Sequence, residues 1–188
     1  MTCQELKENC IQDKIPYLNN DTLAFIKKLI IDNKYHTILE IGTAYGYSAQ
    51  CFSEVDGIDK ILTIEKDSTR YKKACAFLSN NKKISIVNED AHAYNLDSSQ
   101  AFDLIFIDGA KSHQELLVNK YLPLLKNNGK MVIDNIFLKK FNNKTLSKNQ
   151  KKLVEKVNIF REWLVSQTSF SLKIVDIGDG LAIISKLE

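Results

Sequence analysis

The sequence predicts an α/β fold built on a mostly parallel sheet of seven strands that ends in an antiparallel hairpin. Short β-branched and apolar runs alternate with stretches of helical periodicity. The run from Phe102 to Asp108 is apolar at nearly every position before its charged end, as expected for a strand covered by helices on both faces. Only the turn Gly178-Asp179-Gly180 separates the last two runs, so these must pair antiparallel, because a parallel pair needs a longer crossover.

The composition indicates one globular domain, residues 1–188, in the cytoplasm. A chain of 188 residues with 44% apolar residues can bury a large core without crosslinks. No apolar run reaches the roughly 18 residues of a membrane span, and the polar start MTCQELKENCIQDK is unlike a signal peptide. The cysteines lack C-x-x-C spacing, which favours reduced thiols. A net charge of +3 says little about partners.

Two helices are expected before the first strand, in the segment that spans residues 1–36. Leu6 and Cys10 fall at helical spacing in the first helix, and Asn20 or Asp21 can cap the second. Pro16 separates the two helices.

The stretch Thr37–Ala49, TILEIGTAYGYSA, predicts a buried strand, a glycine turn and a helix that begins near Tyr47. Gly42 lets the backbone approach a ligand closely, and Ser48 can donate its hydroxyl to an anionic group. Glu40 places a carboxylate at the end of the strand, which suits a ligand with a cationic group. The alternative is an ordinary strand-to-helix turn with an incidental glutamate.

The same stretch argues against a dinucleotide cofactor. A dinucleotide-binding turn requires G-x-G-x-x-G, and Ala44 occupies the position of the second glycine. An NAD-dependent oxidoreductase is therefore disfavoured, and a site for another nucleotide cofactor is expected.

The next two strands each end at an acidic residue. The second strand, Ile61–Ile64, ends at Glu65, which can accept hydrogen bonds from both ribose hydroxyls. Asp67 is expected to cap a helix that runs to Leu78. The third strand, Ile84–Val87, precedes Asp90, the better acceptor there for an exocyclic amine.

The fourth and fifth strands end in a set of possible metal ligands. The fourth strand ends at Asp108 and is followed by Lys111 and a helix towards Leu125. A turn at residues 127–129 leads to the fifth strand, residues 130–133, which ends at Asp134 and Asn135. Carboxylate and amide oxygens are ligands that Mg²⁺ prefers, so together these residues predict a metal site.

A lysine-rich stretch without acidic residues follows, from Ile136 to Val154, and is expected to be a loop and the start of a helix that ends near Gln167. Its lysines either contact several RNA phosphates or form a solvated loop. Closing strands are expected at residues 171–177 and 181–185. The lysines are Lys139, Lys140, Lys144, Lys148, Lys151 and Lys152.

From about Ile15 to Lys186 the chain resembles the cation-dependent O-methyltransferases, the class I S-adenosylmethionine enzymes that include catechol and caffeoyl-coenzyme A O-methyltransferases. The matching motifs are ILEIGTAYGYSA, ILTIEKD, FDLIFIDGAK, VIDN and GDGLA. The resemblance implies a three-layer Rossmann-like methyltransferase fold with S-adenosylmethionine and Mg²⁺, or another divalent cation, as cofactors. It also implies that the N-terminal segment covers the cofactor site, with Ile15–Leu18 beside it.

The resemblance also assigns site residues position by position. It implies Lys111 as the catalytic base, with Asp108 also in the catalytic machinery, and a metal held by Asp108, Asp134 and Asn135. The residues that it places around the cofactor are Glu40, Gly42, Thr43, Gly46, Ser48, Glu65, Lys66, Asp90, Ala91 and Asp108. The sequence Ser112-His113-Gln114 replaces an aromatic residue found in many relatives, and His113 is a secondary candidate for proton transfer.

The bacterial branch that the chain most resembles methylates 5-hydroxyuridine at the tRNA wobble position, which implies the tRNA anticodon region as a partner. A homodimer is expected, because relatives are commonly dimers. A catechol and 5-hydroxyuracil both present two vicinal oxygens that can chelate one metal ion, so a small catechol-like phenol is the alternative substrate. A noncatalytic module that binds the cofactor or RNA is a further alternative.

Overall fold

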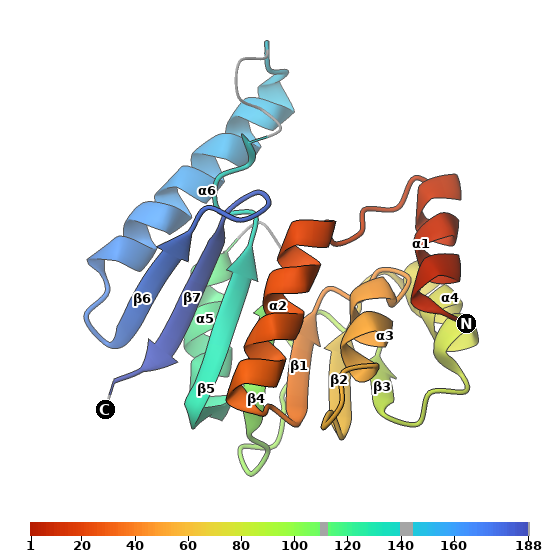
Figure 1. The fold of residues 1–188 in the computed structure, drawn as a ribbon. Helices are drawn as coiled ribbons and strands as arrows, with labels where there is room; N and C mark the ends of the chain where they lie inside the picture. Colours follow the sequence, from red (N-terminus) through yellow and green to blue (C-terminus); the bar gives the residue numbers. More distant parts are fainter. Residues whose placement is uncertain (110–112, 140–144, 188) are drawn as a thin grey trace.

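The computed structural model describes residues 1–109, 113–139 and 145–187. It contains a seven-stranded sheet with the order β3-β2-β1-β4-β5-β7-β6 (Figure 1). Only β7 runs antiparallel to its neighbours, β5 and β6, which confirms the predicted sheet and its C-terminal hairpin. The strands are β1 (Thr37–Ile41), β2 (Lys60–Ile64), β3 (Ile84–Val87), β4 (Phe102–Ile107), β5 (Leu125–Asp134), β6 (Phe170–Val175) and β7 (Leu181–Lys186).

Helices cover both faces of the sheet and form two hydrophobic layers. Side chains alternate along each strand, so that Ile38 belongs to one layer and Leu39 to the other. The first layer contains buried residues of the first four helices, and the second contains those of α5 and α6. The helices are α1 (Cys3–Gln12), α2 (Asn20–Asn33), α3 (Tyr47–Ser53), α4 (Ser68–Leu78), α5 (Gln114–Tyr121), the 3-10 turn η1 (Leu122–Leu124) and α6 (Lys148–Ser166).

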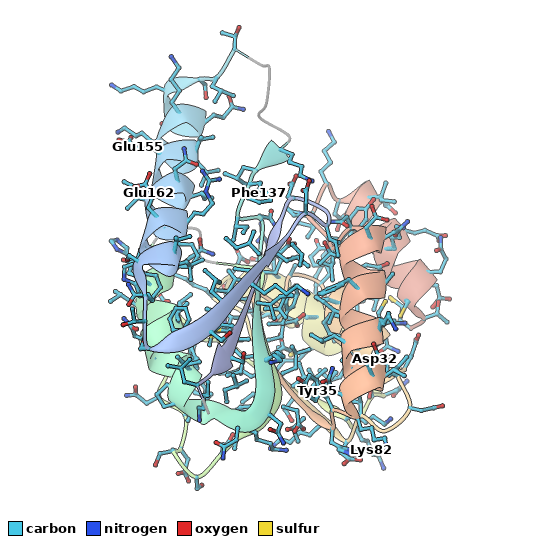
Figure 2. The ribbon with its side chains drawn as sticks, turned by 60° about the vertical axis from the view of Figure 1, so that its left-hand side comes forward. Asp32, Tyr35, Lys82, Phe137, Glu155 and Glu162 are labelled. Atoms are coloured by element: carbon cyan, nitrogen blue, oxygen red, sulfur yellow. The ribbon has the colours of Figure 1, made fainter. Side chains whose placement is uncertain are left out.

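The helix α6 rises along the edge of the sheet and extends beyond it (Figure 1). Its inner face buries Val157, Phe160 and Leu164, whereas Glu155 and Glu162 point away from the body of the molecule (Figure 2). This division follows the 3.6-residue period of an amphipathic helix.

The register of the parallel strands brings their carboxyl ends to one edge. Ile41 of β1 pairs with Ile64 of β2 and with Ile107 of β4, and Ile107 pairs with Ile133 of β5. The residues that directly follow these strand positions therefore emerge together at the same edge of the sheet.

The fifth strand differs from the prediction. It begins at Leu125 and continues through residues 127–129, where the sequence predicts a turn. Phe102 pairs with Leu125 but Leu104 pairs with Lys130, so the extra residues of β5 form a bulge against β4. The Asn-Asn-Gly signal thus marks an irregularity within the strand rather than its start.

Two helix boundaries also differ. The cap of α2 is Asn19, whose side chain accepts a hydrogen bond from the amide of Thr22 at 2.9 Å, rather than Asn20 or Asp21. The helix α5 ends at Tyr121, because Pro123 lies in the 3-10 turn that follows. The predicted cap of α4, Asp67, is confirmed by bonds from the amides of Thr69 and Arg70.

None of the helices in the described part of the chain has the length and apolar character needed to cross a bilayer. All four cysteines are free thiols, and Cys10 and Cys51 are buried. The thiol of Cys3 donates to Glu54 at 3.1 Å and so joins the start of α1 to the end of α3.

Candidate active site

A cavity of about 420 Å³ opens at the carboxyl ends of β1, β2 and β4. This volume is within the range of small-molecule sites. The strand order reverses between β1 and β4, and open α/β sheets bind their ligands at such a reversal. Nine residues predicted for the site line the cavity, namely Gly42, Thr43, Ser48, Glu65, Lys66, Asp90, Ala91, Asp108 and Asn135.

The other four predicted residues are not part of the cavity wall that the described residues form. Glu40 is fully buried and Asp134 is 3% exposed. Gly46 caps α3 with φ of 87°, and a Cβ there would lie 2.4 Å from Leu78, so its role is to allow the turn and the packing of α4. Lys111, the predicted base, lies outside the described residues.

Gly42 is required by a close approach between two loops. Its φ is 104°, and a Cβ on it would lie 2.9 Å from the carbonyl oxygen of Asp108. The amide of Asp108 donates to Ile41 at 3.0 Å, which continues the ladder between β1 and β4 past its last paired residues. Glycine therefore allows Asp108 to reach the cavity wall beside residues 42–46, the loop that is expected to hold the cofactor and is called the cofactor loop below.

Glu40 is the centre of a buried chain of hydroxyl groups. Ser48 donates to one carboxylate oxygen at 2.5 Å, and Thr63 donates to the other at 2.6 Å. The Oγ1 atoms of Thr43 and Thr63 are 2.6 Å apart. Burial raises the pKa of Glu40 to about 7, the two hydroxyl donors oppose this shift, and the carboxylates of Asp108 and Glu65 add to it.

These hydrogen bonds determine whether the hydroxyls of Ser48 and Thr43 donate to a ligand or accept from it. A hydroxyl has one proton, and with Glu40 ionised the proton of Thr63 is used on Glu40, so Thr43 must donate to Thr63. The protons of Ser48 and Thr43 then both point away from the cavity, and their oxygens can only accept from a ligand. The expectation that Ser48 donates to an anionic group therefore does not describe this arrangement.

Glu65 joins two loops with its carboxylate. Its Oε2 accepts from the amide of Ala44 at 2.7 Å, and its Oε1 accepts from the amide of Asp67 at 2.8 Å. The side chain is only 7% exposed. Because each oxygen of a carboxylate can accept more than one bond, Glu65 is held in place and keeps capacity for a ligand.

The loop after β3 is fixed from both sides. Asp90 accepts from the ammonium of Lys66 at 2.6 Å and from the amide of His92 at 2.9 Å, and these bonds lower its pKa. From α5, the buried hydroxyl of Tyr121 donates to the carbonyl of Ala91 at 2.7 Å. Asp90 therefore reaches the cavity already engaged by Lys66.

Asp108 directly follows β4, Asp134 is the last residue of β5, and Asn135 follows it. Asn135 has φ of 65°, a conformation that asparagine tolerates better than most residues, and its amide donates to Asp134 Oδ1 at 2.7 Å. Among the described residues no three His, Cys, Asp or Glu side chains gather in a way that could hold a metal ion. The predicted set consists of two carboxylates and one amide.

Residues 2–187 match the family model described as O-methyltransferase. The chain belongs to the O-methyltransferase family. The match extends over almost the whole chain, so the family assignment covers both the cofactor loop and the C-terminal hairpin.

Solved structures and a curated relative agree with a methyltransferase. This O-methyltransferase is 32% identical to a candidate caffeoyl-CoA O-methyltransferase from Staphylococcus aureus, with a TM-score of 0.88 over 99% of this chain and 92% of that one. The SAH-bound Podospora anserina methyltransferase PaMTH1 has the same fold at 21% identity, with a TM-score of 0.88 over 99% of this chain and 88% of that one.

The curated relative is a Thermoplasma volcanium protein named as a candidate cobalt-precorrin-6B C(15)-methyltransferase (decarboxylating). It is 35% identical over 135 residues, which make up 69% of this chain and 66% of that protein. The chain thus spans slightly less than two thirds of that relative's length.

Several cavity residues of this O-methyltransferase were not predicted as site residues. Tyr45 comes from the cofactor loop, Tyr47 is the first residue of α3, and Arg70 comes from the first turn of α4. They could have been found because they lie within a few positions of Gly46 or Glu65 in the sequence. The expected N-terminal contribution is seen at Pro16, Tyr17 and Leu18, whereas Ile15 packs into the core. The other additions are Cys10, Ile41, Ala44, Ile64, Glu89, His92 and Gly109.

His113, the secondary candidate for proton transfer, lies at the start of α5. Its side chain is 70% exposed, and its Nδ1 is 3.5 Å from the carboxylate of Glu115. It does not line the cavity formed by the described residues. The neighbouring Gln114 is buried, and its Nε2 has no hydrogen-bond partner in the described part of the chain.

Proposed function

We propose that this O-methyltransferase transfers a methyl group from S-adenosylmethionine to a hydroxyl that has a second oxygen on the neighbouring carbon, with the help of a divalent cation. The acceptor that we infer is 5-hydroxyuridine at the wobble position of tRNA, which would become 5-methoxyuridine. The observation that carries the proposal is the cavity wall, which combines Ser48, Glu65 and Asp90 with Asp108 and Asn135.

The cavity wall offers a suitable group for each part of an adenosyl cofactor. Glu65 would accept from the ribose hydroxyls, and the loop with Asp90 and Ala91 would lie along the adenine. Ser48 and Thr43, whose oxygens only accept when Glu40 is ionised, would face the methionine end of the cofactor, which carries the ammonium and, in S-adenosylmethionine, also the sulfonium. The cofactor supplies an electrophilic methyl group on a sulfonium. The SAH-bound state of the Podospora protein supports a cofactor of this class.

The donor set after β4 and β5 suits a hard divalent cation such as Mg²⁺. Asp108, Asp134 and Asn135 all offer oxygen atoms, and the pairing of Ile107 with Ile133 brings both strand ends to one edge. A bound cation would lower the pKa of an acceptor hydroxyl beside it. Asp108 would orient the acceptor, since it lies both in this set and in the cavity wall.

Lys111 is proposed to take the proton from the acceptor hydroxyl. It follows Asp108 by three positions in the sequence and lies outside the described residues. As the acceptor oxygen forms its bond to the methyl carbon, the bond from that carbon to sulfur breaks, and the products are a methyl ether and SAH. Holding the methyl donor and the acceptor next to each other would lower the activation free energy by roughly several kcal/mol.

A basic surface at the cavity end of the molecule supports an RNA acceptor. The first half of α6 carries Lys148, Lys151, Lys152 and Lys156, all exposed. The amino end of α6 lies at the same end of the molecule as the carboxyl end of β5 (Figure 1). Glu155 is the acidic residue in this stretch, so a net positive charge stands where RNA phosphates could contact it.

A small catechol-like or phenolic acceptor is the alternative. The name of the Staphylococcus aureus relative favours it, since caffeoyl-CoA is a phenolic thioester. The same cofactor and cation chemistry would serve both acceptors, because both have two vicinal oxygens. The corrin methylation named for the Thermoplasma relative is a third chemistry, in which carbon receives the methyl group.

The decisive experiment measures methyl transfer from labelled S-adenosylmethionine to tRNA from cells that lack this protein. Catechol, caffeoyl-CoA and 5-hydroxyuridine are tested in parallel, each with and without a chelator. Nucleoside analysis should find label in 5-methoxyuridine, and the chelator should abolish the transfer. Label only in the catechols would overturn the RNA acceptor, and unchanged turnover in the chelator would overturn the cation.

Matched variants separate catalysis from binding. Lys111→Ala and Asp134→Asn should lose methyl transfer, whereas calorimetry should still detect SAH binding by Lys111→Ala. A noncatalytic module would instead show the same absence of turnover in the wild-type protein and in both variants.

A further inference from the structure

The N-terminal wall of the cavity begins where α1 ends. Lys14 adopts φ of 55°, its amide donates to Ile11, and the amide of Ile15 donates to Cys10 at 2.8 Å. These bonds form a Schellman motif that ends the helix and turns the chain. The chain then passes along the cavity through Pro16, Tyr17 and Leu18 before α2 begins.

Asp13, the C-cap residue of α1, connects this wall to the cofactor loop and to α4. Its Oδ2 accepts from the hydroxyl of Tyr45 at 2.8 Å and from the ammonium of Lys73 at 2.5 Å. The ammonium of Lys73 also lies 4.9 Å from the centre of the Tyr45 ring. Three segments far apart in the sequence, α1, the cofactor loop and α4, therefore meet at one carboxylate.

Tyr45 links the contact at Asp13 to the cavity. It lines the cavity, is 5% exposed, and packs edge to face against Phe77 of α4 with 5.6 Å between the ring centres. On the N-terminal side, Tyr17 packs edge to face against Tyr47 at 5.8 Å. The first contact joins α4 to Tyr45 of the cofactor loop, and the second joins the N-terminal segment to Tyr47, the first residue of α3.

We propose that Asp13 is a positioning residue that fixes the N-terminal cavity wall against Tyr45 of the cofactor loop, and thereby sets the affinity for the adenosyl cofactor. Without its carboxylate the phenol of Tyr45 and the ammonium of Lys73 lose their shared acceptor, and the wall is tied to the loop by fewer contacts. The inference rests on the proposed cofactor, because it needs S-adenosylmethionine to bind in this cavity.

The test compares Asp13→Ala, Asp13→Asn and the wild-type protein in calorimetric titrations with SAH and in steady-state assays. Asp13→Ala should raise the Kd for SAH and the KM for S-adenosylmethionine about three- to tenfold, the range for a partly exposed charged hydrogen bond. The value of kcat should change less than about twofold, because the reacting groups are untouched. Asp13→Asn keeps an acceptor for Tyr45 and should give an intermediate Kd.

Glu8→Ala is the matched control, because Glu8 is an exposed carboxylate of the same helix whose described contact is to Gln4. It should leave the Kd unchanged. A double-mutant cycle with Tyr45→Phe identifies the contact, since Asp13→Ala should add little to the loss caused by Tyr45→Phe. If Asp13→Ala reduced the yield of folded protein, Lys73→Met would remove the other donor and should also raise the Kd.

The outcomes separate this inference from the proposed function. If wild-type protein bound neither SAH nor S-adenosylmethionine, the proposed function would fail and this inference with it. If the wild-type protein bound SAH and Asp13→Ala bound it equally well, only the positioning role would be overturned. A loss of kcat without a change in KM would overturn it as well.

Discussion

Ser48 donates its only hydroxyl proton to Glu40, with 2.5 Å between Ser48 Oγ and Glu40 Oε1. Glu40 is fully buried and its other oxygen accepts from Thr63. Above about pH 7, where Glu40 is ionised, the cavity therefore has a negative charge directly behind a hydroxyl that faces the ligand. Such an arrangement favours a cationic ligand, because a buried carboxylate is stabilised by nearby positive charge.

Glu40→Gln should reduce the preference for the cationic methyl donor over its demethylated product. S-adenosylmethionine carries a sulfonium that SAH lacks, so loss of the buried charge should raise the Kd for S-adenosylmethionine by about tenfold, or ~1.4 kcal/mol. The Kd for SAH should rise by less. Calorimetric titrations of both ligands measure the two constants.

Thr63→Val is the control for Glu40→Gln. It removes one hydroxyl donor to Glu40 but keeps the carboxylate, so it should change the two dissociation constants by similar factors. Equal shifts for both ligands in Glu40→Gln would contradict the charge argument.

The stability of the ligand-free protein should also depend on Glu40. Its pKa is raised from 4.5 to about 7 in the fold. The folded protein therefore holds this proton more tightly, so the contribution of Glu40 to the unfolding free energy is complete below about pH 4.5 and is lost as pH rises to about 7. The loss should be about 3 kcal/mol relative to Glu40→Gln. Denaturant unfolding of both proteins at several pH values measures it.

The groups that face Glu40 determine the sign of this effect. Ser48 and Thr63 donate to it, while Glu65 after β2 and Asp108 after β4 are carboxylates that raise its pKa further. The expected result is that the wild-type protein becomes less stable than Glu40→Gln as the pH rises. If it instead became less stable than Glu40→Gln as the pH falls, Glu40 would be ionised in the folded protein at all pH values tested, and the argument would be wrong.

A half-buried carboxylate, Asp103, stabilises the opposite edge of the sheet. Its Oδ2 accepts from the amides of His36 and Thr37 and from the ammonium of Lys126 at 3.0 Å. Burial raises its pKa, but these bonds outweigh burial and lower it. Asp103→Ala should therefore lower the unfolding free energy by about 1–3 kcal/mol, because it removes the shared acceptor of two backbone amides and of Lys126.

The pH dependence of Asp103 has the opposite sign to that of Glu40. Because its pKa is lowered below 3.8 in the fold, its contribution is present above that value and is lost as pH falls through the folded-state pKa. Thermal unfolding between about pH 2 and pH 6 should show that acid lowers the unfolding temperature of Asp103→Ala less than that of the wild-type protein. Asp59→Asn, an exposed carboxylate near His36, should behave like the wild-type protein.

The strand ends were predictable from sequence because strand register alone brings them together. Glu65 and Asp108 follow residues paired with the ends of β1 in parallel ladders, so an acidic residue after an apolar run was enough to place them. The bulge in β5 was not predictable, since the Asn-Asn-Gly signal is local whereas the pairing with β4 that overrides it is tertiary.

Contacts between distant segments account for the rest of the site. Asp13 is separated from Tyr45 by 32 positions and from Lys73 by 60, and no periodicity links them. The burial of Glu40 also depends on Thr63, which the sequence presents only as a strand residue. Sequence reasoning thus found residues placed by the sheet and missed those placed by packing between helices and loops.

The basic face of α6 gives the last prediction. Replacing Lys148, Lys151 and Lys152 together with glutamate should raise the KM for tRNA at least tenfold, because binding of each phosphate by a lysine is accompanied by release of a counterion. Turnover of a small catechol, if measurable, should be unchanged, since these side chains do not line the cavity formed by the described residues. Methylation rates at several salt concentrations measure the effect.

Lys28, Lys34 and Lys82 provide the matched control, because they are exposed and lie outside α6 and the cavity wall. Their replacement by glutamate makes the same change in net charge and should lower the affinity for tRNA far less. The slope of log affinity against log salt should decrease in magnitude by about one unit for each phosphate that the α6 variant no longer binds. Equal losses of affinity in both triple variants would mean that RNA responds to net charge rather than to α6, and an unchanged KM in the α6 variant would remove the surface argument for tRNA.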